Sequence, residues 1–512
     1  MFKGVESGKR LTDAAFREAK DQLRLDLVDL QQRCRASAEF PIIVVVAGVQ
    51  GAGGIDTLNL LNTWMDPRWI QTHAFDSPSD EERDRPLFWR YWRSLPEAGA
   101  IGLYMDGWYG DAWAARAQNK TTPAAFAADL KRIAAFEQTL AADGALIVKL
   151  WLHLGKAAQK SKADTHKVDP IFGFRSSDAA WPQPAGYDAF TNAAAQSIRA
   201  TSTDVAPWHL IDAADDNARR IAVLTTLRDA MKSHRKAWHK KAKATAKVLK
   251  HDRKADKKQK PARSKRDALA RVDLTKTMSD EAYAKAFRTR QAKLYDLQKA
   301  ARAAGLSTVI AFEGWDAAGK GGALRRLTYA LSARNYSVVP ISAPTDEELA
   351  HHYLWRFWRH LCRAGHMTLF DRSWYGRVLV ERVEHLIPEE AWKRAYSEIN
   401  DFEAQLAAHD TVVLKFWLHI DADEQLKRFK DREKTSYKNW KITEDDWRNR
   451  SKHAAYELAV NDMFAATSPK TAPWHLIPAN HKHIARIMIF DIVVKALEAA
   501  LVGRAKLRNK LT

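Results

Sequence analysis

The sequence predicts two tandem α/β domains, each with a parallel sheet between two layers of helices. Three observations predict this fold class. The 512-residue chain repeats itself at a constant shift of 266 residues, which places Trp89 on Trp355 and Trp208 on Trp474. Such a constant shift indicates duplicated domains. Short, continuously apolar segments alternate with segments of helical periodicity, as in parallel sheets covered on both faces. Each repeat is also long enough to bury its own core.

The first repeat contains these elements in a regular order. Residues 12–38 have the periodicity of an amphipathic lead-in helix, and the apolar residues 42–47 predict a buried strand that leads into a glycine-rich loop. Helical segments separate the other predicted strands. These strands are residues 69–75, 100–105, 145–152 and 208–212.

The second repeat follows the same order. A helix is predicted over 280–303, and a long helix rich in aromatic residues over 349–361. The predicted strands are residues 308–312, 337–342, 367–370, 412–418 and 474–477. We therefore expect a first domain at residues 1–235, a basic linker at 236–275 and a second domain at 276–512.

The net charge of +20 is concentrated near the predicted linker. Between Lys232 and Arg266 there are sixteen Lys or Arg and two Asp. The start of this segment is expected to continue a helix from the first repeat, and residues 257–264 to form the linker. The segment is either a solvated linker or a surface that attracts polyanions such as phosphate chains.

Composition excludes several protein classes. No apolar run approaches the roughly 20 residues that span a bilayer, so we expect no membrane segment. The two cysteines, Cys34 and Cys362, occupy unmatched positions in the repeats, so neither a disulfide framework nor a cysteine metal site is expected. Because no disulfides are expected, we expect a cytoplasmic protein. We also expect a homo-oligomer.

A phosphate-binding loop follows the first predicted strand of the second repeat. Residues 313–322 read Glu-Gly-Trp-Asp-Ala-Ala-Gly-Lys-Gly-Gly, which contains G-x-x-x-x-G-K between a strand and a helix. Successive backbone N–H groups can surround a phosphate there, and the helix N-terminus adds positive potential. The domains are therefore expected to resemble P-loop kinases. The expected phosphate or nucleotide contacts are Gly314, Ala317, Ala318, Gly319, Lys320, Gly321, Gly322, Arg325 and Arg326.

Two carboxylates are the candidate metal ligands. Gly321 replaces the usual Ser or Thr after the lysine, so magnesium, or manganese in its place, needs other oxygen ligands. Asp316 lies in the loop, and Asp371 lies at the carboxyl end of a predicted strand near it. A structural capping role is the alternative for each. The first repeat has Gln50 and Met105 at these positions, which favours a catalytic role.

Two arginines are the candidate groups for stabilising a transferring phosphoryl group. Guanidinium groups bind phosphate oxygens in a bidentate manner, and Arg372 and Arg377 flank the sequence Ser-Trp-Tyr-Gly. The first repeat has aspartates at both positions. The residues that recur in both repeats are instead expected to pack or orient the elements. These are Arg356, Trp374, Tyr375 and His419.

A basic segment downstream of the predicted strand 412–418 is the candidate lid. Mobile lids of nucleotide kinases close over phosphates and exclude water. The candidate phosphate-binding residues here are Lys430, Arg432, Lys434 and Lys438. Much of this positive charge is absent from the first repeat. A solvated helix face is the alternative.

The motifs of the second repeat resemble the type 2 polyphosphate kinases. The resemblance is carried by residues 313–322, by residues 344–356 and by residues 371–384, which begin Asp-Arg-Ser-Trp-Tyr-Gly-Arg. It covers residues 279–502 with specific motifs and residues 12–235 as a degenerate copy. A fused pair with one intact site is similar to the two-domain branch of this family, the polyphosphate:AMP phosphotransferases.

This resemblance implies magnesium-dependent transfer of the terminal phosphate of polyphosphate to AMP, giving ADP. It assigns the Walker A residues to Asp316 and Lys320, the Walker B residues to Asp371, Arg372 and Arg377, and the lid to the segment around Arg432. Polyphosphate-dependent phosphorylation of ADP or GDP is the alternative in the same family. Less favoured are an ATP-dependent nucleoside monophosphate kinase and a nucleic-acid-binding protein, since no recognised nucleic-acid module accompanies the basic segment.

Overall fold

The computed structural model describes residues 1–166, 186–255, 267–435 and 443–511. They form two compact units. The first unit contains residues 1–79, 90–244 and 345–355, and the second contains residues 80–89, 245–344 and 356–512. Residues 79–89 and 345–355 are related by the shift of 266. Each unit therefore includes a short segment from the other repeat, an exchange that the sequence did not predict.

Both units contain a five-stranded parallel sheet. The order is β2-β3-β1-β4-β5 in the first and β7-β8-β6-β9-β10 in the second, so the topology is the same. The strands of the first sheet are β1 (Ile42–Gly48), β2 (Ile70–Ala74), β3 (Ile101–Met105), β4 (Leu146–His153) and β5 (Trp208–Asp212). Those of the second are β6 (Ser307–Gly314), β7 (Tyr336–Pro340), β8 (Met367–Asp371), β9 (Thr411–His419) and β10 (Trp474–Pro478).

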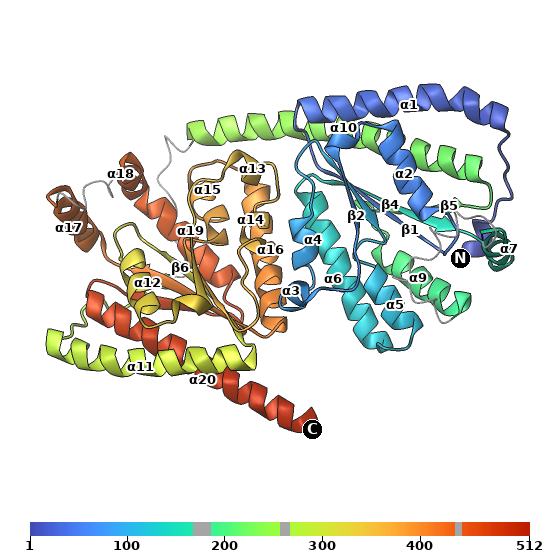
Figure 1. Cartoon of the computed structure of the whole chain (residues 1–512). Helices are drawn as coiled ribbons and strands as arrows, with labels where there is room; N and C mark the ends of the chain where they lie inside the picture. Colours follow the sequence, from blue (N-terminus) through green and yellow to red (C-terminus); the bar gives the residue numbers. More distant parts are fainter. Residues whose placement is uncertain (167–185, 256–266, 436–442, 512) are drawn as a thin grey trace. The chain divides into compact units, whose positions relative to one another are not determined.

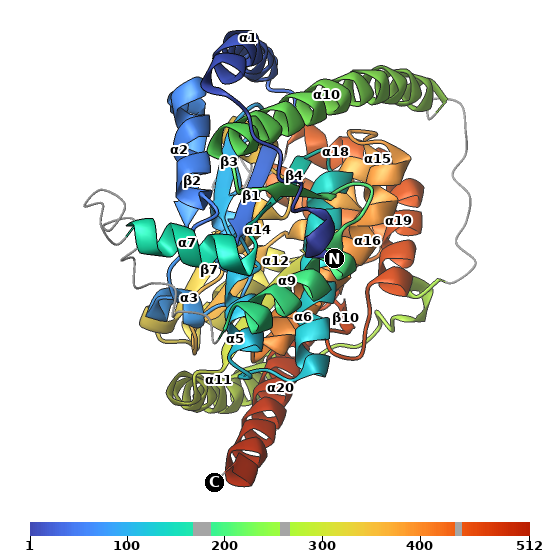
Figure 2. The ribbon, with the colours of Figure 1, turned by 90° about the vertical axis from the view of Figure 1, so that its right-hand side faces the viewer.

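Helices cover both faces of the first sheet. α2 packs on β1 and β3, and α1 packs on α2, whereas α5, α6 and α9 pack together on the opposite face (Figure 2). The helices of the first repeat are α1 (Asp13–Ala36), α2 (Gly54–Trp64), α3 (Asp80–Arg83), α4 (Trp89–Arg93), α5 (Gly110–Ala117), α6 (Pro123–Ala142), α7 (Lys156–His166), α9 (Tyr187–Thr201) and α10 (Asp216–Ala255). α10 confirms that the helix at the end of the first repeat continues into the basic segment; the predicted linker at 257–264 lies outside the described residues.

The second sheet is covered in the same way. α11 lies alongside α20, and α20 packs on α12, β9 and β10, while α16 packs on β9 from the other face (Figure 1). The helices of the second repeat are α11 (Asp280–Ala304), α12 (Lys320–Tyr329), α13 (Asp346–Leu349), α14 (Trp355–Trp358), α15 (Val380–Val383), α16 (Glu389–Ala408), α17 (Ala422–Glu433), α18 (Glu444–Ser451), α19 (His453–Ala466) and α20 (Lys482–Leu511). The predicted fold class, two tandem three-layer α/β/α domains, is confirmed.

The prediction of one long aromatic helix over residues 349–361 is wrong. The chain forms two single-turn helices there, α13 and α14, separated by a turn. In this turn the backbone N–H of Leu354 donates to Nδ1 of His352 (3.2 Å). Such a local side-chain bond competes with helical hydrogen bonding. Among the described residues we find no helix with the length and hydrophobicity of a membrane span.

In each unit a buried ion pair joins the sheet to a helix that covers it. In the second unit Lys415 of β9 donates to Glu403 of α16 (2.7 Å) and to the carbonyl of Thr467 (2.6 Å), and both charged side chains are fully buried. Tyr375 Oη and Trp374 Nε1 also donate to Glu403 (2.7 and 3.0 Å). Burial raises the pKa of Glu403, and the nearby Lys415 opposes the shift. A buried charge is tolerated only with such complete hydrogen bonding.

The first unit repeats this network at corresponding positions. Lys149 donates to Glu137 (2.6 Å) and to the carbonyl of Thr201 (2.7 Å). Tyr109 Oη and Trp108 Nε1 donate to Glu137 (2.6 and 2.9 Å). The residues shared by the two repeats are thus used for packing, as the comparison of the repeats predicted for Trp374 and Tyr375.

Replacing the lysine of either pair should destabilise its own unit. Lys415→Met leaves a buried carboxylate without its cation, which should cost about 3–5 kcal/mol of unfolding free energy. Hydrogen exchange followed by peptide should accelerate in β8 and β9. Lys149→Met should instead accelerate exchange in β3 and β4, whereas Lys293→Met, which breaks an exposed pair with Glu498, should alter neither. Unchanged exchange in both buried variants would contradict this role.

Candidate functional site

The loop between β6 and α12 has the backbone of a phosphate-binding loop. Gly314 has φ +145°, and a Cβ there would lie 2.5 Å from the carbonyl oxygen of Leu418, so only glycine fits. Gly319 caps α12 in the left-handed region (φ +109°), and its carbonyl accepts the first helical bond, from Ala323 (2.9 Å). The N-terminus of α12, with its positive potential, therefore opens onto the loop.

Lys320, the first residue of α12, is held inside this loop. Its Nζ donates to the carbonyls of Gly314 (2.7 Å) and Trp315 (3.3 Å). An ammonium group has three N–H donors. Two of them fix the side chain against the loop, and the third is available to a phosphate oxygen at the helix N-terminus.

Asp316 is fixed by groups from two other segments. Its Oδ1 accepts from Arg372 Nη2 (3.4 Å), and its Oδ2 accepts from Asn449 Nδ2 of α18 (2.9 Å). The side chain is 13% exposed. These bonds join the loop, the end of β8 and α18 at one point.

Asp371 lies at the carboxyl end of β8, next to the first turn of α12. It is in register with Phe312 of β6. A Cβ on Gly321 would lie 3.7 Å from its Oδ2, so the carboxylate faces the helix N-terminus. Gly321 has no side chain that would contact this carboxylate.

Arg372 follows directly in the left-handed conformation (φ +64°), which is uncommon for a residue with a side chain. Its backbone N–H donates to the carbonyl of Phe312 (3.1 Å), and its side chain is 56% exposed. Burial lowers the pKa of this guanidinium, but the carboxylates of Asp316, Glu313 and Asp371 raise it more. Arg372 therefore presents a positive charge beside the carboxylate of Asp316.

The other charged residues predicted to bind phosphate lie outside the loop between β6 and α12. Arg377 pairs with Glu381 one turn along (2.7 Å) and is 14% exposed. Arg326 of α12 is half-buried, whereas Arg325, Lys430 and Lys434 are exposed. Burial lowers the pKa of Arg432, against the attraction of the Asp446 and Asp316 carboxylates. Lys438 lies outside the described residues.

Sequence reasoning missed Arg428 of α17, which clamps the loop. Its Nη1 donates to the carbonyls of Ala317 and Ala318 (both 3.0 Å), and its Nη2 donates to Ala479 (2.7 Å) and Asn480 (2.9 Å). The side chain is 6% exposed. Within a run of lysines and arginines, no sequence signal distinguishes this buried residue from its exposed neighbours.

Sequence reasoning also missed three other residues. Gln425 Nε2 donates to the carbonyl of Asp316 (3.1 Å), and Asn449 binds its carboxylate. Glu313 accepts from Ser373 Oγ (2.8 Å), and burial raises the pKa of this carboxyl group against the pull of Lys320. The first repeat has Ala47 and Gly107 at the positions of Glu313 and Ser373, so comparison of the repeats could have identified that pair.

The corresponding loop of the first unit is filled by its own side chains. Arg219 of α10, 1% exposed, donates from Nη1 to the carbonyl of Ala52 (3.1 Å). A Cβ on Gly53 would lie 2.1 Å from that Nη1, and a Cβ on Gly54 would lie 2.7 Å from Met105 Cε. The guanidinium and the methionine therefore occupy the space beside the loop, in line with the prediction that this half lacks a site.

His419 and Arg356 have structural partners, as the comparison of the repeats predicted. Trp315 Nε1 donates to Nδ1 of His419 (2.9 Å). Burial, reinforced by His453, lowers the pKa of His419 to about 4. Arg356 donates to the carbonyl of Ser342 (3.3 Å).

The chain is similar to known proteins over both repeats. The family model of polyphosphate kinase 2 matches residues 10–239 and 277–505. A polyphosphate:AMP phosphotransferase of Pseudomonas aeruginosa is 42% identical over 98% of this chain and 99% of its own length. One from Acinetobacter johnsonii is 36% identical over 94% of this chain and 96% of its own. A crystal structure described as a putative polyphosphate kinase 2 from Pseudomonas aeruginosa superposes with a TM-score of 0.85 at 39% identity, over 98% of this chain and 100% of that one.

Removing the clamp should loosen the loop. Arg428→Met leaves four carbonyls without their donor, and we expect faster hydrogen exchange in residues 315–323. Lys427→Met is the matched control, since that neighbouring side chain is 72% exposed. Equal exchange in the two variants would show that Arg428 does not hold the loop.

His419 should make the fold sensitive to acid. Its folded pKa, about 4, lies below the usual value of 6.5. As the pH falls from 6.5 to 4 the unfolded chain takes up a proton that the folded chain does not, so stability decreases, by up to about 3 kcal/mol. His419→Asn keeps an acceptor for Trp315 and should reduce the loss in urea titrations at pH 7 and 5. His251→Asn, at an 83% exposed position, should not.

Proposed function

The chain belongs to the polyphosphate kinase 2 family, and from this premise we propose that it is a polyphosphate:AMP phosphotransferase. It transfers the terminal phosphate of inorganic polyphosphate to AMP and gives ADP. The observation that carries this assignment is the similarity over the whole chain. The relatives that span both repeats are named polyphosphate:AMP phosphotransferases, whereas a relative from Meiothermus ruber named AMP/ADP-polyphosphate phosphotransferase matches 40% of this chain.

The chemistry fits the groups at the loop. An oxygen of the AMP phosphate attacks the terminal phosphorus of the chain, the P–O bond to the next phosphate breaks, and the chain leaves one phosphate shorter as an anion. The attacking oxygen is already ionised near neutral pH, so no general base is required. Positioning and charge stabilisation then account for the rate.

Different residues of the second unit are proposed to bind the phosphates, to stabilise the transferring group and to position the loop. Backbone N–H groups of the loop and Lys320 hold the outer phosphates, and Arg372 stabilises the charge on the transferring group. Arg428 and Asn449 keep the loop and Asp316 in place. Arg432 and the lysines of α17 are proposed to close over the polyphosphate and exclude water.

Magnesium is proposed as the cofactor, with manganese able to replace it. Mg²⁺ is bound by one or two carboxylates together with phosphate oxygens and water. Asp371 is the better placed ligand because its carboxylate faces the space beside Gly321, whereas both oxygens of Asp316 accept hydrogen bonds from the protein. When bound, the metal neutralises charge on the phosphates.

The alternative acceptors and donors are distinguished in one assay. Purified protein is given magnesium and either polyphosphate or ATP as donor, with AMP, ADP, GMP or GDP as acceptor. The proposal expects the fastest reaction from polyphosphate to AMP. Faster phosphorylation of ADP or GDP would favour the nucleoside diphosphate kinase, and a preference for ATP the monophosphate kinase.

A cytoplasmic location is proposed on chemical grounds, because AMP is an intracellular metabolite and both cysteines are free thiols. Homo-oligomer formation stays a prediction.

Loss of the loop lysine or of the carboxylate at β8 should abolish transfer. Lys320→Ala and Asp371→Ala should each lower kcat by roughly 100-fold or more, because Lys320 stabilises phosphate charge directly and Asp371 is the proposed ligand of the metal that does so. Both variants should keep the wild-type circular dichroism spectrum. Gly54→Lys added to Lys320→Ala should restore nothing, since Arg219 and Met105 occupy the first loop. Near-wild-type turnover in either single variant would overturn the site.

A further inference from the structure

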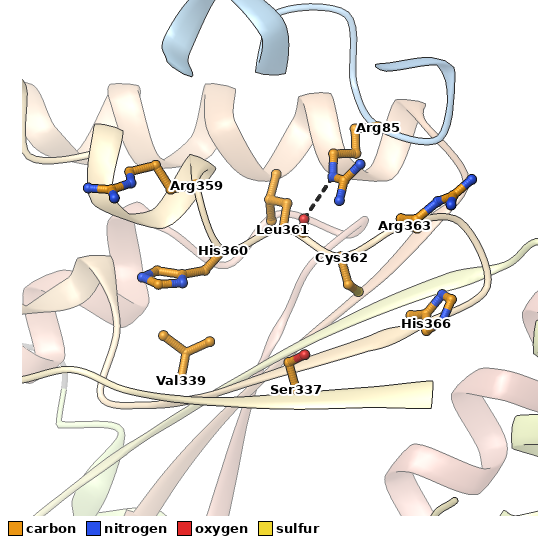
Figure 3. A pocket seen from close by; sticks show the side chains of 9 residues that line it. All are labelled: Arg85, Ser337, Val339, Arg359, His360, Leu361, Cys362, Arg363 and His366. Atoms are coloured by element: carbon orange, nitrogen blue, oxygen red, sulfur yellow. Dashed lines mark hydrogen bonds between the residues drawn. The ribbon is translucent and has the colours of Figure 1, made fainter. Parts of the chain in front are cut away.

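A cationic cavity lies in the second unit, beside the edge strand β7. Its volume is about 350 Å³. Figure 3 shows Arg85, Arg359 and Arg363 around it together with two histidines, His360 and His366. None of its lining residues is acidic. Arg85 belongs to the segment 80–89 that the first repeat contributes to this unit.

The cavity is separate from the catalytic loop. Its floor is the middle of β7, and His366 directly precedes β8. Lys320 and Asp371, by contrast, lie at the carboxyl ends of β6 and β8. His366 therefore lies at the opposite end of β8 from Asp371, and the residues that line the cavity do not include any residue of the loop.

Two guanidinium groups of the cavity are held in place by the protein. Arg85, 9% exposed, donates from Nε to the carbonyl of Leu361 (2.8 Å) and from Nη1 to that of Glu81 (2.8 Å). Arg363 donates from Nε to Asp84 (2.7 Å), with its side chain 56% exposed. Groups fixed in this way lose little conformational freedom on binding an anion.

The first unit lacks most of this cationic cluster. The positions of Arg85, His360, Arg363 and His366 correspond in the first unit to His351, Ser94, Glu97 and Ala100. Only Arg359 has a cationic counterpart, Arg93. In the first unit Glu97 accepts a bond from Arg35 instead (3.0 Å). Because the fold is the same in both units, it does not itself require these cations.

We propose that this cavity binds inorganic phosphate groups, either as free phosphate or as part of a polyphosphate chain, at a site distinct from the catalytic one. Fixed guanidinium groups bind phosphate oxygens in a bidentate manner. No Trp, Tyr or Phe lines the cavity, so it lacks the usual surface for stacking a base. An inorganic ligand therefore fits better than a nucleotide.

Cys362 provides a probe inside the cavity. It is one of the lining residues and is partly exposed, whereas Cys34 is fully buried. The full chain is alkylated with iodoacetamide, a neutral reagent, and labelling of Cys362 is followed by peptide mass spectrometry. Tripolyphosphate, inorganic phosphate, ADP or chloride is added at constant ionic strength. At ten times its Kd a bound ligand should slow labelling about tenfold.

The variants separate the cavity from the catalytic site. Arg363→Glu, which introduces the residue type of the first repeat, should abolish protection, and Arg288→Glu, at an exposed position of α11, should leave it intact. Protection should also survive in Lys320→Ala. Because labelling needs no turnover, this result is independent of the reaction proposed above.

Three outcomes would overturn the proposal. They are absence of protection by both phosphate and tripolyphosphate, equal protection in Arg363→Glu, and loss of protection in Lys320→Ala, which would attribute the effect to the catalytic loop. Stronger protection by ADP than by tripolyphosphate would overturn the choice of an inorganic ligand. Comparing free phosphate with tripolyphosphate then identifies which inorganic source is bound.

Discussion

The buried pair of Lys415 and Glu403 constrains the whole second unit. Two charges are stable without water only if every polar atom around them is paired, so β9, α16 and the turn that carries Trp374 and Tyr375 must meet at one point. That turn begins directly after Asp371 and Arg372. The packing network therefore fixes the direction in which the chain that carries these two candidate site residues leaves β8.

The first unit shows that this scaffold does not require the chemistry. It keeps the corresponding network around Glu137 and Lys149, yet its loop is filled by Arg219 and Met105. Fold and function thus depend on different residues. The cationic groups of the cavity beside β7 resemble the candidate site residues in this respect, since the first unit retains a cationic counterpart, Arg93, for Arg359 alone among its three arginines.

The exchanged segments suggest why the first repeat is retained although its loop is filled by its own side chains. Residues 80–89 belong to the second unit, and Arg85 is bonded there to the carbonyl of Leu361. The first repeat thus supplies part of the wall of the cavity beside β7. A degenerate copy can keep such a structural contribution after losing its own phosphate loop, because the contribution depends on a segment that does not belong to that loop.

The sequence by itself determined the duplication, the two parallel sheets and the loop around Lys320, because these depend on local periodicity and on a motif of contiguous residues. Comparison of the repeats also separated packing residues such as Tyr375 from candidate site residues such as Asp371, whose catalytic roles stay predictions. Only the tertiary structure identified Arg428, Asn449 and the exchange of residues 80–89. Each of these depends on contacts between residues that are far apart in the chain. Neither residue type nor spacing predicts which distant carbonyl or carboxylate a side chain will contact.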